Sequence, residues 1–107
     1  MIQAIYYRDE NRVTVEGHAY SGEPGSDLVC AAASILVYTL ATNLEEMEHQ
    51  GIITNVFKFL EPGIADIKCD VDPEYTSYAA RIIEAVCVGF ELLAMDYSDF
   101  VNYEVQG

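Results

Sequence analysis

The spacing of apolar residues along the chain switches between the period of two of a half-buried strand and the longer period of a helix. Two strand-like segments, residues 2–7 and 13–17, open the chain, with turn-forming residues between them. After an irregular segment over residues 19–26, a helical pattern runs from Asp27 to about Glu48, and Gly51 ends it. The first half of the chain therefore predicts two strands followed by one long helix.

The second half of the chain repeats this order. Residues 52–60 and 65–71 predict the strands of a hairpin, joined by a Glu61-Pro62-Gly63 turn. A second helix starts at Asp72-Pro73, with proline at its first position, and residues 99–105 alternate again as a closing strand. The predicted order is ββαββαβ, an α+β fold class with two helices packed on a mostly antiparallel sheet.

Each helix shows an apolar stripe, which predicts the face that it buries against the sheet. Small residues early in the first helix permit close packing there. The predicted stripe of the first helix is Leu28, Ala31, Ala32, Ile35, Leu36, Thr39, Leu40, Leu44 and Met47, and that of the second is Tyr75, Tyr78, Ala79, Ile82, Val86, Phe90 and Leu93.

Length and composition limit the class of protein. A chain of 107 residues, 51% of them apolar, can bury one core, so we expect a single domain over residues 1–107. No run of eighteen apolar residues is present, so we expect no membrane span, and the first residues lack the features of a secretory signal. Three cysteines without a C-x-x-C spacing argue against a disulfide framework and for the reducing cytoplasm.

The charge is strongly acidic, with 5 basic residues against 18 acidic ones and a net charge of −13. Such a surface repels a nucleic-acid backbone, and no basic stripe overcomes that repulsion, so we expect no nucleic-acid partner. A basic protein partner would instead be attracted over long range. The simpler alternative is that the acidity only keeps a small protein soluble.

Cys30 is the candidate nucleophile. Ser26 or Asp27 is the predicted N-cap of the helix, and Cys30 is the third helical residue when Asp27 is the cap. At this early position the positive end of the helix dipole favours a thiolate. His18 lies twelve residues earlier, at the end of the second strand, and a nearby imidazole can take the thiol proton. Strand alternation puts His18 on the face opposite to Val15. We therefore predict a site formed by Cys30 and His18, with the glycine-bearing segment between them at its mouth.

The other histidine and cysteines are interpreted as structural. His49 lies at the acidic end of the first helix, Cys69 faces the core from its strand, and Cys87 falls beside the stripe of the second helix. The histidines and cysteines do not have the ligand spacing of a zinc site. The segment Gly22-Glu23-Pro24-Gly25 lacks the lysine of a phosphate-binding loop. We therefore expect no metal and no cofactor.

The residues around the Cys30–His18 pair resemble the motif of the ribosomal-processing cysteine proteases. These are small bacterial enzymes that trim an N-terminal extension from a large-subunit ribosomal protein. The resemblance extends through the order of strands and helices, and its one visible departure is Ala33, where a valine is expected. Because Ala33 lies in the helix, we expect it to affect packing and not the pair. The matching residues are Gly17-His18-Ala19, Gly22, Gly25, Asp27, Val29-Cys30-Ala31-Ala32 and Ser34.

The resemblance implies a cysteine endopeptidase with Cys30 as nucleophile and His18 as general base. It also implies that the substrate is a ribosomal protein precursor and that the protein is a homodimer. Backbone N–H groups at the start of the first helix are the expected oxyanion donors.

Further residues of the motif are expected to support the site. Asp27 either caps the helix or orients the histidine. Ser34, one turn beyond the cysteine, can hydrogen-bond the site or its own helix backbone. Tyr20, Gly22 and Gly25 lie in the segment that we expect to close over an extended peptide.

Two other functions are compatible with the sequence. A homologue encoded by a phage or mobile element would trim a capsid or scaffold protein with the same pair of residues. A non-catalytic dimeric module would bind a basic protein and use Cys30 for packing alone.

Overall fold

The computed structural model describes residues 1–18 and 24–107, and for residues 24–27 it describes the backbone alone. The main elements follow the predicted order ββαββαβ. The strands are β1 (Ile2–Tyr7), β2 (Arg12–Glu16), β3 (Ile53–Glu61), β4 (Ile64–Val71) and β5 (Val101–Gln106), the helices are α1 (Pro24–His49) and α2 (Thr76–Asp96), and two 3-10 helices are η1 (Arg8–Glu10) and η2 (Pro73–Tyr75).

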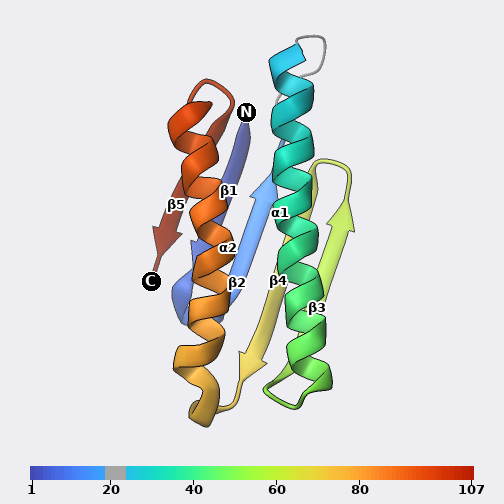
Figure 1. Cartoon of the computed structure of the whole chain (residues 1–107), viewed down its shortest axis with the longest axis vertical. Helices are drawn as coiled ribbons and strands as arrows, with labels where there is room; N and C mark the ends of the chain where they lie inside the picture. Colours follow the sequence, from blue (N-terminus) through green and yellow to red (C-terminus); the bar gives the residue numbers. More distant parts are fainter. Residues whose placement is uncertain (19–23) are drawn as a thin grey trace.

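A five-stranded sheet carries both helices on the same face (Figure 1). The strand order is β3-β4-β2-β1-β5, and every neighbouring pair is antiparallel except β1 and β5, which run parallel. Helix α1 lies over β3 and β4, and α2 lies over β1 and β5. The predicted α+β class with a mostly antiparallel sheet is confirmed.

The face of the sheet beneath the helices is apolar because alternate residues of each strand point to it. This alternation is regular in β1 and β4, the strands whose pattern was clearest in the sequence. Buried on this face are Ile2, Ala4, Tyr6, Val13, Val15, Ala65, Ile67, Cys69 and Val101.

The buried face of α1 differs from the predicted stripe in its N-terminal half. Leu28 and Ile35, predicted to be buried, are 60% and 61% exposed. Small and β-branched residues take their place because they allow the helix to approach the sheet closely. The buried stripe of α1 is Val29, Ala33, Val37, Leu40, Ala41, Leu44 and Met47.

The two helices approach each other where α2 carries a glycine. A Cβ added to Gly89 would lie 3.0 Å from Cδ1 of Leu36 and closer still to Cδ2, so Leu36 occupies the space over Gly89. The prediction for α2 was wrong at its start, where Tyr75 and Tyr78 are exposed. The buried residues of α2 are Ala79, Ile83, Val86, Cys87 and Phe90.

The segment Leu28–His49 of α1 is long and apolar enough to cross a membrane by length and composition alone. A helix in the core of a soluble protein passes the same test. In this structure one face of the segment packs on the sheet.

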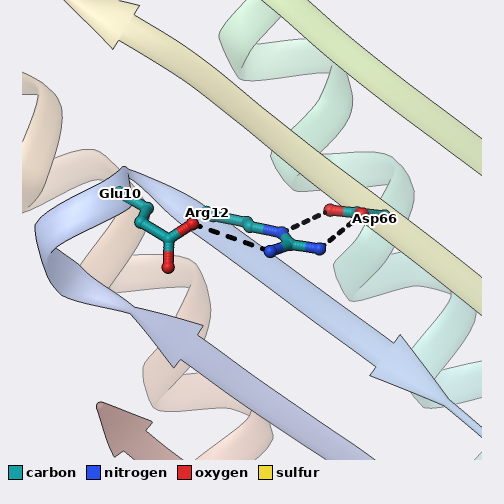
Figure 2. A network of polar contacts seen from close by, with 3 residues as sticks. All are labelled: Glu10, Arg12 and Asp66. Carbon is teal, nitrogen blue, oxygen red and sulfur yellow. Dashed lines mark hydrogen bonds and ion pairs between the residues drawn. The ribbon is translucent and has the colours of Figure 1, made fainter. Parts of the chain in front are cut away.

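Polar side chains tie strands together on the face of the sheet away from the helices (Figure 2). Arg12 of β2 donates two hydrogen bonds to Asp66 of β4, at 2.9 and 2.8 Å, and Glu10 lies 3.6 Å away on its other side. These bonds lower the pKa of the Asp66 carboxyl. Because β2 leads to His18 and β4 begins beside it, this pair holds together two strands that position the candidate site.

Candidate active site

A cavity of about 430 Å³ opens between the N-terminal half of α1, the end of β2 and the tip of the β3–β4 hairpin. Cys30 and His18 both line it, as the sequence predicted. Its remaining walls are mostly apolar, and Glu61 is their only carboxylate among the described residues. The lining residues are Ile2, Val15, Gly17, His18, Cys30, Ala33, Ser34, Val37, Tyr38, Leu60, Glu61, Pro62, Gly63, Ile64 and Ala65.

Cys30 differs from the other two cysteines in its exposure. It is half-buried on α1 and faces the cavity, whereas Cys69 and Cys87 are 4% and 2% exposed in the core. Burial raises the pKa of Cys69 to about 11, and that of Cys87 to about 11 as well. Both therefore remain protonated and enclosed, which agrees with their predicted structural role.

Helix α1 starts earlier than predicted, at Pro24 instead of after Asp27. Proline suits the first helical position because its fixed φ matches the helix and its missing N–H is not needed there. The prediction that Ser26 or Asp27 is the N-cap was therefore wrong, since both lie within the first turn. Gly25 also lies in this turn and not in a loop.

The earlier start places Cys30 in the second turn of α1, where the effect of the helix dipole is weaker than at the predicted third position. At this depth in a helix a backbone N–H has an intrahelical partner, so the N–H of Cys30 is not free to bind an oxyanion. The free N–H groups belong to the turn before it.

His18 reaches the cavity because Gly17 breaks the alternation of β2. The strand ends at Glu16, and Gly17 adopts a φ of +99°. The predicted placement of His18 on the face opposite to Val15 was wrong, since both residues line the same cavity. The nitrogen of Met1 donates a hydrogen bond of 2.7 Å to the carbonyl of His18, which fixes this part of the backbone.

The tip of the β3–β4 hairpin lies against His18. The N–H of Gly17 donates a hydrogen bond of 2.8 Å to the carbonyl of Gly63. A Cβ added to Gly63 would lie 2.8 Å from Cε1 of the imidazole and closer still to Nε2. The imidazole is therefore in van der Waals contact with the backbone of the hairpin turn.

Two residues one turn beyond Cys30 also line the cavity. Ser34 is exposed and lines the cavity. Ala33 is buried, which agrees with its predicted packing role, and it also forms part of the cavity wall. A valine at this position would narrow the space beside the thiol. Tyr20 and Gly22 lie outside the described residues.

Two further features are absent among the described residues: a hydrogen bond between the two candidate side chains and a cluster of metal ligands. Within residues 1–18 and 24–107, no hydrogen bond joins the side chains of Cys30 and His18. The same part of the chain holds no group of three or more histidine, cysteine or acidic side chains that could bind a metal. The chemistry available here is that of a thiol and an imidazole in an apolar cavity.

Sequence reasoning missed the contribution of the hairpin tip and of Tyr38 to the cavity. The Glu61-Pro62-Gly63 turn was recognised, but its position beside His18 depends on the pairing of β2 with β4. No local signal in the sequence predicts that pairing. Tyr38 follows Cys30 by eight residues, and this helical spacing could have placed it on the same side of α1.

A thiol and an imidazole that share a cavity are the two side chains that cysteine peptidases use. The family model of the cysteine protease Prp matches residues 1–102, and the chain therefore belongs to this family. The chain is accordingly a cysteine protease. No curated protein matches the sequence.

Solved structures show the same fold. The crystal structure of SMU.848 from Streptococcus mutans is 30% identical, with a TM-score of 0.68 and coverage of 99% of this chain and 94% of that one. Two crystal structures of the ribosomal processing protease Prp from S. aureus contain a covalently linked product peptide and a substrate peptide, respectively. They are 18% and 16% identical, with TM-scores of 0.68 and 0.69, and cover 98% of this chain and 97% of theirs. At this level of sequence identity, the similarity to the two S. aureus structures shows the fold alone.

Proposed function

We propose that this protein is an endopeptidase that removes a short N-terminal extension from a large-subunit ribosomal protein precursor, with Cys30 as nucleophile and His18 as general base. The observation that carries the proposal is the presence of both side chains in one cavity that is large enough for several residues of a peptide. Cys30 is also the half-buried cysteine, while Cys69 and Cys87 are enclosed in the core.

In the proposed reaction His18 takes the proton from the Cys30 thiol, and the thiolate attacks the carbonyl carbon of the scissile bond. The tetrahedral intermediate collapses as His18 gives this proton to the leaving amine, which departs with the downstream protein. The extension remains on Cys30 as a thioester. Water then attacks the thioester, with His18 accepting a water proton and returning it to the sulfur, so the free thiol and a carboxylic acid result.

The apolar walls and the charge of the protein support a basic protein substrate with apolar residues at the cleavage site. Leu60, Ile64 and Tyr38 offer apolar and aromatic contacts to side chains on either side of the bond. A net charge of −13 attracts a basic protein, and ribosomal proteins are typically basic. The S. aureus protease with the same fold is described as a ribosomal processing protease, which supports the same substrate class here.

The proposal includes the predicted homodimer in the cytoplasm. Large apolar side chains are exposed on the outer sides of both helices, which a second copy of the chain would cover. The mass of the protein in solution tests this part. The exposed side chains outside the cavity are Leu28 and Ile35 on α1 and Tyr78, Val88, Leu92 and Met95 on α2.

Cleavage of an extended ribosomal protein precursor, followed by mass spectrometry, tests the proposal. We expect one cleavage site with the parent protein and a loss of at least about 1,000-fold in rate with Cys30→Ala or His18→Ala. Cys69→Ala and His49→Ala are the matched controls, since Cys69 is buried and His49 lies exposed at the end of α1, and both should retain cleavage.

Each other outcome of this experiment points to a different function. Cleavage that survives Cys30→Ala would contradict the proposed nucleophile. No cleavage of the ribosomal precursor, together with cleavage of a capsid or scaffold protein, would favour a phage-type substrate. No cleavage of either, with Cys30 alkylated no faster than a model thiol, would favour a binding module.

A further inference from the structure

We propose that Gly63, at the tip of the β3–β4 hairpin, is a positioning residue that sets where the imidazole of His18 lies relative to Cys30. This inference rests on the proposed function in one respect, since it takes His18 to be the general base. It adds the hairpin to the machinery of the site, although the hairpin follows His18 by more than forty residues in the sequence.

The backbone of the hairpin tip is tied to the segment that carries His18. Strand β4 pairs with β2 up to the pair Glu16↔Ile64, next to the turn. Beyond that pair the N–H of Gly17 donates its 2.8 Å hydrogen bond to the Gly63 carbonyl. These hydrogen bonds hold Gly63 beside the residue that precedes His18.

Gly63 then contacts the imidazole directly. Its position is such that a Cβ would lie 3.2 Å from Cδ2, 2.8 Å from Cε1 and closer still to Nε2. Real Cβ atoms essentially never come this close to another heavy atom, so with any side chain at position 63 the ring or the backbone beside it must shift. The φ of +80° at Gly63 adds a second requirement for glycine.

The displacement matters because proton transfer depends on distance. A general base must come within about 2.6–3.2 Å of the group whose proton it takes. A misplacement of about 1 Å can cost about 100-fold in rate. A methyl group at position 63 would push on the edge of the ring that carries Nε2, one of the two nitrogens able to accept the proton.

The chain offers a matched control for the strain of a positive φ. Gly51, at the end of α1, has a φ of +78°, but a Cβ there would meet nothing within 4 Å. Gly51→Ala therefore introduces the same backbone strain without touching a catalytic side chain. Any effect of Gly63→Ala beyond that of Gly51→Ala reports the contact with His18.

The first test compares peptide cleavage by Gly63→Ala and Gly51→Ala. We expect Gly63→Ala to lower kcat about 100-fold with little change in KM, and Gly51→Ala to leave both near the parent values. The NMR signals of the His18 ring should shift in Gly63→Ala and not in Gly51→Ala. Equal activity of the two variants and an unchanged His18 ring would overturn the proposal.

The second test is a double-mutant cycle on stability, which needs no activity. Because the added methyl group collides with the ring, Gly63→Ala should lower the Tm by less in a His18→Ala background than in the parent. Equal losses of Tm in the two backgrounds would overturn the proposed contact.

The failure of this inference can be told apart from the failure of the proposed function. If the His18→Ala variant retains full cleavage, the proposed function fails. If His18→Ala abolishes cleavage while Gly63→Ala behaves like Gly51→Ala, only the inference on Gly63 fails and the proposed function stands.

Discussion

At the scale of single residues, the environment of each cysteine separates a reactive position from two structural ones. Reactivity needs a thiolate and access to it. Cys69 and Cys87 lack both, because the core encloses them and burial raises the pKa of each to about 11. Cys30 faces a cavity that also holds an imidazole. Its sequence context predicted this difference, since the glycine-histidine segment and the helix that follows bring His18 near.

Selective alkylation measures this difference. At pH 7, on the order of one in ten thousand thiols with a pKa of about 11 is ionised, so Cys69 and Cys87 should react slowly in the folded protein. We expect iodoacetamide to add one group, on Cys30, and to add the other two only after unfolding in guanidinium chloride. Intact-mass spectrometry followed by peptide mapping reads this out. Simultaneous labelling of all three cysteines in the folded protein would contradict the prediction.

At the scale of elements, strands were easier to predict than the ends and faces of helices. Alternation identified β1, β2 and the β3–β4 hairpin because period two is visible over a few residues. The start of α1 was misplaced because proline at position 24 and aspartate at position 27 are both acceptable helix starts. The buried face of α1 was misplaced because Leu28 and Ile35 look like core residues in sequence. Their exposure depends on how the helix packs.

The Arg12–Asp66 ion pair joins β2 to β4, and its contribution to the free energy of unfolding can be measured. The hydrogen bonds from Arg12 lower the pKa of Asp66, so the pair gives its full stabilisation above the unfolded-state pKa of about 4. It loses this contribution as the pH falls from there through the lowered pKa of the folded protein. Asp66→Asn should therefore reduce the free energy of unfolding by about 1–2 kcal/mol at pH 7. The difference from the parent protein should be smaller at pH 3, and it should vanish only below the lowered pKa of Asp66 in the folded protein.

Urea unfolding at both pH values, monitored by circular dichroism, tests this prediction. Lys58→Met is the matched control, because Lys58 and its partner Glu45 form an ion pair in which both side chains are nearly half exposed. We expect a loss of less than about 0.5 kcal/mol for this variant. An equal loss for both variants, or a loss for Asp66→Asn that is independent of pH, would contradict the assigned role of Asp66.

At the scale of the whole molecule, the site exists because three separate segments of the chain meet at one end of the sheet. The first two, His18 and Cys30, are close enough in sequence for a motif to predict their meeting. The third, the hairpin tip, arrives through the β2–β4 pairing, and pairing between distant strands is not encoded in any short pattern. The sequence therefore predicted that Cys30 and His18 meet, but not that the hairpin tip lies against His18.

The central claim is that Cys30 attacks the peptide bond, and trapping its covalent intermediate tests this most directly. The substrate is an activated ester of the peptide that ends at the cleavage site, mixed with the protein and quenched rapidly in acid. Intact-mass spectrometry with peptide mapping then locates the adduct. The account predicts a thioester on Cys30 in the parent and in His49→Ala, and none in Cys30→Ala. A thioester or ester on another residue in place of Cys30 would contradict the account. Peptide cleavage that persists in Cys30→Ala would contradict it as well.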